Sequence, residues 1–131
     1  MDPASRHQAR ERALSLLYEA ELKGDAPSVV VAGLPAEPDG FVVDLLAAVE
    51  DGQEEIDRMI DDASIGWDVG RLAVVDRIVL RMAVAELRSF PDVPVAVVLN
   101  EAVELATAYS TEESGRFVNG VLATLATLIR G

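Results

Sequence analysis

Cysteine is absent from this chain of 131 residues, and histidine and aromatic residues are scarce. Without cysteine there can be no disulfide, thiolate metal site or cysteine nucleophile. The single histidine, His7, lies near a chain terminus and is poorly placed to serve as the base of a nucleophilic triad. Glycine signatures for phosphate binding and the ligand spacings of zinc sites are also missing. The composition argues against an enzyme and predicts neither a metal ion nor a cofactor.

Long hydrophobic runs are missing as well. No stretch approaches the roughly 18 uninterrupted apolar residues of a membrane span, and no apolar signal-peptide segment follows the N-terminal arginines. We therefore expect a cytoplasmic protein that makes no contact with a membrane. Half of the residues are hydrophobic, which is enough to build the core of one domain over residues 1–131.

Positive charge is in short supply, since the net charge is −12. The acidity is concentrated in residues 37–68, which hold eleven of the twenty-three acidic residues and a single arginine. Residues 69–131 hold six arginines against seven acids, so this part is close to neutral. The total charge therefore does not exclude a polyanionic ligand. The acidic middle can restrict such a ligand to one face, although added solubility is the simpler explanation.

The apolar residues recur at helical spacing along most of the chain. Helices are expected over residues 2–23, 41–63, 72–90 and 95–109 and from Ser114 onward, with a short helical turn inside the loop 24–40. A break at 64–70, which contains Trp67, separates an N-terminal half of about 1–63 from a C-terminal half of about 64–131. The pattern predicts an all-α fold of six or seven helices arranged as two small bundles.

Arginines at the start of the first helix are the first candidate binding residues. Arg6 and Arg10 continue the apolar arc of that helix toward its N-terminus, where we expect them to project beyond the bundle. Together with Arg12 they oppose the helix macrodipole, which favours acidic residues there by roughly 0.3–1 kcal/mol each. Arg77 and Arg81 share a second stripe that is expected to be exposed. These arginines either bind a ligand or form solvated helix surfaces.

The tetrapeptide Phe117-Val118-Asn119-Gly120 is the most distinctive local feature. Phe117 falls on an apolar stripe with Leu128, and Tyr109 is expected to face inward from the preceding helix. Asn119 lies on the opposite, polar side, within a helix whose expected N-cap is Ser114. The glycine suggests close approach of a neighbouring helix or of a ligand backbone. On these residues alone, helix packing beside a solvated asparagine is favoured over a binding role.

Several separated stretches resemble the NusB family of bacterial transcription antitermination factors, in the same order along the chain. They are RHQARERALSLLYEAEL, WDVGRLAVVDRIVLRMAVAEL, VPVAVVLNEAVELA and NEAVELATAYSTEESGRFVNGVL. The resemblance covers most of the chain apart from residues 24–40, and implies the family's all-helical fold. It further implies binding of boxA RNA together with NusE, a small-subunit ribosomal protein, within the transcription elongation complex, in support of ribosomal RNA operons.

Carried over by position, the resemblance assigns RNA binding to Arg6, His7, Arg10, Arg81, Tyr109, Phe117 and Asn119. It assigns partner-protein binding to Tyr18, Leu22, Asp76 and Glu113. The chain departs from the family at its start, where Ser5, His7 and Gln8 interrupt an arginine run that is often almost continuous. Fewer phosphate contacts predict weaker binding to RNA alone, a shallower salt dependence and greater reliance on NusE.

Two other classes of protein compete with this interpretation. One is a homo-oligomeric helical interaction protein, such as a homodimer, in which Tyr18 and Leu22 are buried between subunits and the partner surface is masked. The other is a fragment of an enzyme, because a similar domain precedes the catalytic part of some ribosomal RNA cytosine methyltransferases. No cofactor-binding segment is found up to Gly131, which argues against the fragment.

If Arg10 projects from the bundle, Arg10→Ala weakens RNA binding and leaves stability unchanged or slightly raised.

Overall fold

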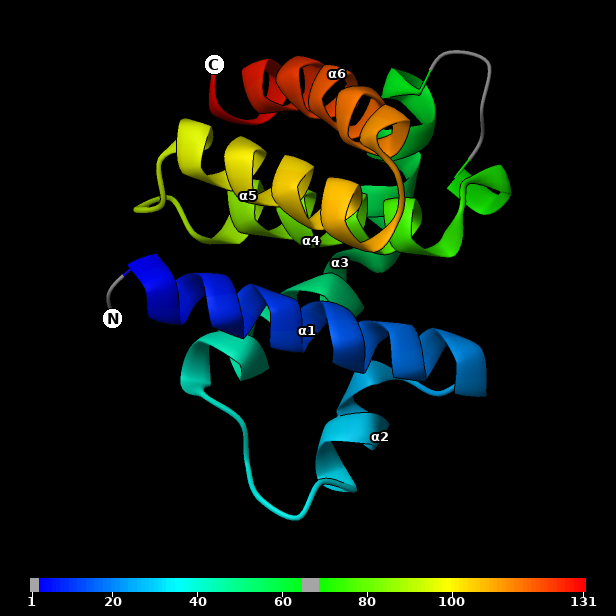
Figure 1. Ribbon diagram of the computed structural model, residues 1–131, viewed down its shortest axis with the longest axis vertical. Coiled ribbons are helices and arrows are strands. Elements are labelled where there is room, and N and C mark those ends of the chain that lie inside the picture. The colour runs from blue at the N-terminus through cyan, green and yellow to red at the C-terminus, as the bar shows by residue number, and fades with distance from the viewer. Residues whose placement is uncertain (1–2, 65–68) are drawn as a thin grey trace.

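The structure, a computed structural model, describes residues 3–64 and 69–131 and is helical throughout, with no strand in these two ranges (Figure 1). Asp2, where the first helix was expected to begin, and Trp67, in the expected break, lie outside the described residues. Its elements are α1 (Pro3–Lys23), α2 (Pro27–Ala32), α3 (Gly40–Ala63), the 3-10 helix η1 (Val69–Arg71), α4 (Val74–Ser89), α5 (Val95–Tyr109) and α6 (Glu112–Arg130). The predicted all-α fold is confirmed.

The first helix follows its sequence pattern closely. Its apolar arc is buried as expected, through Ala9, Ala13, Leu16, Leu17 and Ala20. The helix ends at Gly24, which adopts a φ of 70° that residues with a Cβ seldom take. The backbone N–H of Asp25 then donates to the carbonyl of Ala20 at 3.0 Å, which satisfies one of the free carbonyls at the helix end.

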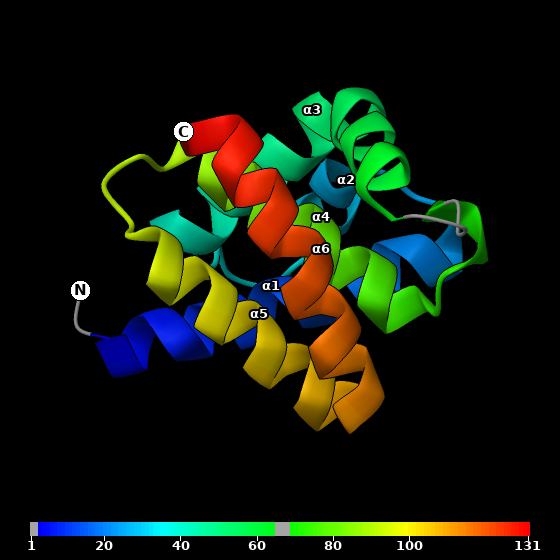
Figure 2. The ribbon, with the colours of Figure 1, turned by 90° about the horizontal axis from the view of Figure 1, so that it is seen from above.

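Helix α4 is the centre of the packing, because α1, α3, α5 and α6 all contact it. Its residues are buried on nearly every side, including all of those from Ile78 to Leu87, as expected for a central helix. Figure 1 shows α5 and α6 as successive layers on one side of α1, with α2 on the other, and Figure 2 shows α6 and α5 crossing above α1. Helix α3 contacts both α1 and α6, so it joins the two halves of the chain.

The start of α6 corrects the predicted cap. Thr111, not Ser114, is the N-cap, since the Thr111 hydroxyl accepts a hydrogen bond from the Ser114 backbone N–H at 2.9 Å. Ser114 lies in the first turn of the helix and is buried. Its hydroxyl donates to Asp76 Oδ2 at 2.9 Å, which ties α6 to the start of α4.

Two predictions of burial near the chain's last two helices were wrong, since Tyr109 is 51% exposed and Leu128 is 72% exposed. Of the two explanations offered for Gly120, close approach of a neighbouring helix is wrong as well, because a Cβ there would meet nothing within 4 Å in the part of the chain that the structure describes. The glycine that permits close packing is Gly115, where a Cβ would clash with Oγ1 of Thr107 on α5.

Within the described residues, none of the helices combines the length and the apolar character that crossing a membrane would require.

Candidate nucleic-acid interface

Arg10 does not project from the bundle, and this prediction is corrected. Its guanidinium donates to both carboxylate oxygens of Glu86 on α4, from Nε at 2.7 Å and from the second terminal nitrogen at 2.8 Å. Both side chains are only 3% exposed. Arg10 continues the apolar arc of α1 because it is part of the core, where a buried acid on another helix balances its charge.

Arg6, one turn earlier on α1, is partly buried. Its guanidinium carbon lies 4.4 Å above the centroid of the Phe41 ring, which is a cation–π contact. The Arg6 Nε atom is buried and has no hydrogen-bond partner in the part of the chain that the structure describes. Phe41 therefore holds the side chain of Arg6 at the start of the helix without neutralising its charge.

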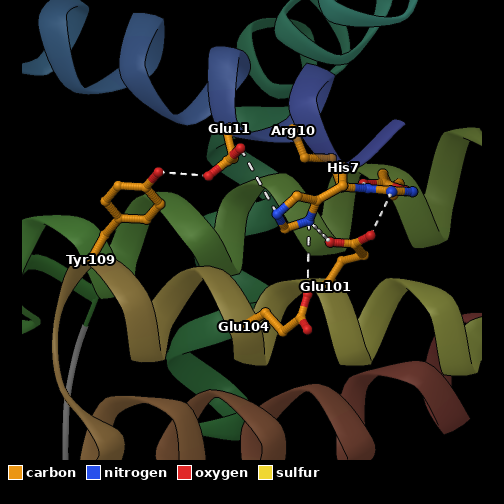
Figure 3. A network of polar contacts seen from close by, with 7 residues as sticks. His7, Arg10, Glu11, Glu101, Glu104 and Tyr109 are labelled. Carbon is orange, nitrogen blue, oxygen red and sulfur yellow. Dashed lines mark hydrogen bonds and ion pairs between the residues drawn. The ribbon is translucent and has the colours of Figure 1, made fainter. Parts of the chain in front are cut away.

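His7 is the centre of a polar network between α1 and α5 (Figure 3). Its Nδ1 atom lies 2.6 Å from Glu101 Oε2 and 3.7 Å from Glu104 Oε2, and its Nε2 atom lies 3.8 Å from Glu11 Oε1. The hydrogen bond to Glu101 and the charges of the three glutamates raise the pKa of His7 above its usual value, against the opposing effect of desolvation. The imidazole therefore keeps its proton to a higher pH than a free histidine does.

Tyr109 closes one end of this network. Its hydroxyl donates to Glu11 Oε2 at 2.6 Å, and the hydrogen bond raises the pKa of Tyr109. The ring itself is exposed at the end of α5. Tyr109 and Tyr18 line the same shallow groove between α1, α4 and α5, so an aromatic surface extends along α1 from the His7 network.

Arg77 and Arg81 do not form an exposed stripe, which corrects a second prediction. Arg81 is buried and donates to both oxygens of Asp57 on α3, at 2.7 and 2.8 Å. Arg77 pairs with Glu21 on α1, and that carboxylate also lies 3.6 Å from Arg81. These arginines link α4 to α1 and α3, away from the His7 network.

Phe117 lies at the margin of the core. It packs against the buried cluster but is itself only partly buried. It lines a pocket of about 410 Å³ with Asp76, Glu113 and other residues of η1, α4 and α6. The buried Asp76 Oδ1 atom has no hydrogen-bond partner among the described residues. The pocket therefore combines an aromatic face with an acceptor whose hydrogen-bonding capacity is unused.

Asn119 is exposed, as predicted from its place opposite the apolar stripe, and it lies where α6 borders α5. It lines a depression with Arg116, Asn100 and Glu104. Because Glu104 also belongs to the His7 network, the depression and the network adjoin across α5. This surface offers an amide and an arginine, neither of which is buried.

Exposed apolar side chains mark another part of the surface. Tyr18 is 40% exposed and Leu22, one turn later on α1, is 66% exposed, so both are available to a partner, as their assignment to a partner surface requires. An aromatic and an aliphatic side chain at neighbouring turns form a compact patch that a protein partner can cover.

The candidates thus fall into separate groups. His7, Tyr109 and Asn119 share one continuous surface. Phe117 shares a pocket with Asp76 and Glu113. Arg10 and Arg81 are instead buried in ion pairs, with Glu86 and Asp57 respectively. The residue-based interpretation missed the glutamates around His7, because α1 and α5 are far apart in sequence. It also gave no role to Arg116, which is exposed, and weighed Arg12, which is exposed as well, only together with Arg6 and Arg10.

Comparison with known proteins places this chain in a family. The sequence model of the NusB family matches residues 7–127 of this chain. The transcription antitermination protein NusB of Acidothermus cellulolyticus is 44% identical over 125 residues, which cover 92% of this chain and 86% of the relative.

Solved structures agree with the sequence match. NusB of T. maritima superposes with a TM-score of 0.84 at 30% identity, covering 93% of this chain and 90% of that one. A structure of the antitermination factors NusB and NusE in complex with double-stranded RNA matches with a TM-score of 0.78 at 30% identity, covering 94% and 96%. The chain therefore belongs to the NusB family of transcription antitermination proteins.

Proposed function

We propose that this protein is a non-catalytic antitermination factor that binds boxA RNA together with NusE and supports processive transcription of ribosomal RNA operons. The observation that carries the proposal is the match over nearly the whole chain to a NusB that is bound to both NusE and RNA. Within the transcription elongation complex, the protein would act by binding alone, with the RNA and NusE on neighbouring surfaces.

The proposed RNA surface centres on His7, Tyr109 and Asn119, with Arg6 and Phe117 at its margins. The Arg6 guanidinium supplies positive charge for phosphates, and the imidazole of His7 adds to it when it is protonated. The exposed ring of Tyr109 and the face of Phe117 can stack on unpaired bases, and the Asn119 amide can hydrogen-bond to base edges. These side chains supply the contact types expected of a protein that reads single-stranded RNA.

Arg10 and Arg81 take a different part in the proposal. Contact between either guanidinium and a phosphate requires that it leave its carboxylate, Glu86 or Asp57. We therefore assign first contact with phosphates to exposed arginines, Arg12 on α1 and Arg116 on α6, and assign Arg10 and Arg81 to holding α1 and α3 against α4.

Acidic residues next to His7 should lower the affinity of this surface for RNA. Glu11, Glu101 and Glu104 surround His7, so phosphate groups approaching the imidazole meet three carboxylates. This supports the expectation from sequence that RNA binds weakly to the protein alone and that NusE supplies much of the affinity.

The proposed NusE surface includes Tyr18 and Leu22 on α1, and Asp76 and Glu113 beside the Phe117 pocket. The apolar pair can be covered by partner side chains. The free Oδ1 atom of Asp76 can accept a hydrogen bond from a donor that NusE inserts into the pocket.

Titration of boxA RNA into the protein, with and without NusE, tests the proposal directly. We expect NusE to tighten binding to boxA RNA much more than binding to a scrambled RNA of equal length. Asn119→Ala and Tyr109→Ala should weaken the ternary complex, whereas Arg58→Ala, which removes an exposed charge on the acidic face of α3, should not. Equal binding of boxA and scrambled RNA in the presence of NusE would sink the proposal.

The exposure of Tyr18 and Leu22 also supports the second candidate, self-association that masks the partner surface. Sedimentation over a range of concentrations separates the two functions. A strict monomer excludes the second, whereas a dimer that Leu22→Asp disrupts and that NusE dissociates would support it.

A further inference from the structure

Three potential metal ligands converge at the point where α1 and α5 meet. His7 offers Nδ1, while Glu101 and Glu104 each offer a carboxylate oxygen, and these atoms lie within 4.8 Å of one another. Figure 3 shows the carboxylates of Glu101 and Glu104, both from α5, turned toward the same ring nitrogen of His7. We propose that His7, Glu101 and Glu104 form a binding site for a divalent transition-metal ion such as Zn²⁺.

The distances fit such an ion with small adjustments. Zinc binds nitrogen and oxygen ligands at about 2.0–2.2 Å, so tetrahedral geometry separates the ligand atoms by roughly 3.3–3.5 Å. His7 Nδ1 and Glu104 Oε2 are 3.7 Å apart, close to this value. His7 Nδ1 and Glu101 Oε2 are 2.6 Å apart and must separate by under about 1 Å as the ion replaces their shared proton. Glu104 is 68% exposed and free to adjust.

Neighbouring side chains already orient two of the three ligands. The second oxygen of Glu101 lies 3.5 Å from a terminal nitrogen of Arg10, which Glu86 holds in place. The second ring nitrogen of His7 faces Glu11.

The remaining oxygen of Glu11 is fixed in turn by the hydroxyl of Tyr109 at 2.6 Å. A carboxylate behind the ligating imidazole, itself hydrogen-bonded, is the usual outer shell of a histidine-ligated metal. An ion bound to His7 Nδ1 would therefore find the ring already turned toward it.

The ligand set selects the class of metal. One imidazole nitrogen with two carboxylates suits zinc and its neighbours, whereas magnesium and calcium prefer oxygen ligands alone. A neutral imidazole and two carboxylates also balance a divalent charge, and the protein's net charge of −12 favours cations in general. Three protein ligands leave the fourth position of a tetrahedral ion for water.

This site could not be recognised from residue spacing, because His7 and Glu101 are separated by 94 positions and come from different helices. Spacing rules detect metal ligands that lie close together in the chain. Here only the pair Glu101 and Glu104, three positions apart on α5, is local. Two carboxylates at that spacing are common on solvated helices.

Calorimetric titration of the full metal-stripped chain with zinc chloride at neutral pH tests the proposal. We expect one ion per chain, and no comparable binding of magnesium chloride. His7→Gln and Glu104→Gln should each weaken zinc binding more than about tenfold, because each removes a ligand. Glu54→Gln, which removes an exposed carboxylate from α3, is the matched control and should leave zinc binding unchanged.

A second measurement identifies the ligand. His7 is the only histidine, so the ring signals in an NMR spectrum report on it alone. Zinc should shift these signals in the unmodified chain and in Glu54→Gln. Zinc binding that leaves them unchanged, affinity that survives His7→Gln, or absence of stoichiometric binding would each overturn the proposal. No RNA or NusE enters the experiment, so its outcome does not depend on the proposed function.

Discussion

Arg10 and Glu86 form a two-point ion pair inside the core, with N–O distances of 2.7 and 2.8 Å and 3% of each side chain exposed. The pair joins α1 to α4, the helix that most of the others contact. A further terminal nitrogen of Arg10 faces Glu101 on α5 at 3.5 Å. One arginine therefore connects three helices, and the position of the proposed RNA surface on α1 and α5 depends on it.

Arg10→Ala should lower the free energy of unfolding by about 3–5 kcal/mol, because it leaves the Glu86 carboxylate buried without its partner. This is opposite to the expectation from the helix macrodipole, whose effect is roughly 0.3–1 kcal/mol. Urea denaturation followed by circular dichroism measures the change.

Arg12→Ala is the matched control for Arg10→Ala, since it removes an exposed arginine from the same helix. It should change stability by no more than about 0.5 kcal/mol. Replacing both partners, Arg10→Met with Glu86→Leu, should recover most of the lost stability because no charge then remains buried. Equal effects of the Arg10 and Arg12 single substitutions would contradict the assignment.

The fold was largely predictable because helical periodicity is a local property. Residues 95–109 were expected as a helix and form α5, and Gly24 ends α1 as expected. The chemistry of buried charge was not predictable. A helical wheel places Arg10 on the core arc, but it contains no information about Glu86, which lies 76 positions away. An arginine on an apolar arc therefore signals either a projecting end or a buried ion pair.

The exposure of surface residues was also hard to predict from helical periodicity alone. Tyr109 and Leu128 fit the apolar stripes of their helices, yet both are exposed. Periodicity gives the face of a helix and says nothing about how far its neighbours extend. The positions of Asn119, Tyr18 and Leu22 could be predicted because they depend only on lying outside the apolar arc.

Thr111→Ala should lower the free energy of unfolding by about 1 kcal/mol, because it removes the hydroxyl that caps α6. Thr111→Ser keeps the cap oxygen and should remain close to the unmodified protein. Thermal unfolding of the two variants makes the comparison. If Thr111→Ala and Thr111→Ser were equally stable, the hydrogen bond from the Ser114 backbone N–H would contribute nothing.

Stability should fall as pH rises through the raised pKa of His7. Protonated His7 is stabilised by Glu101, Glu11 and Glu104, and Glu101 is shared with Arg10. Because the pKa is higher in the folded chain, this stabilisation is complete below the unfolded value of about 6.5 and disappears at pH above the folded value. An NMR titration of the imidazole in the presence of a chelator measures the folded pKa.

Glu101→Gln removes the hydrogen-bonded carboxylate charge and should lower the pKa of His7 toward its usual value. His7→Gln should abolish this part of the pH dependence of unfolding. A folded pKa at or below about 6.5 in the unmodified chain would show that the glutamates do not act on His7 as the distances imply.

The two glycines of α6 should respond in opposite ways to alanine. Gly115→Ala should destabilise the protein by about 1–3 kcal/mol, because the new methyl group meets the Thr107 hydroxyl. Gly120→Ala should stabilise it by about 0.4–1 kcal/mol, since the position is helical and its Cβ would lie in open space. Denaturant unfolding of both variants measures the difference.

Thr107→Ala added to Gly115→Ala should restore part of the lost stability, which identifies the clash as the cause. Gly120→Ala also separates packing from binding. If RNA backbone approaches this exposed glycine, the variant should be more stable and yet bind boxA RNA and NusE less tightly. A variant that is more stable and binds equally well would leave Gly120 with no part in recognition and confine the RNA surface on α6 to Arg116, Phe117 and Asn119.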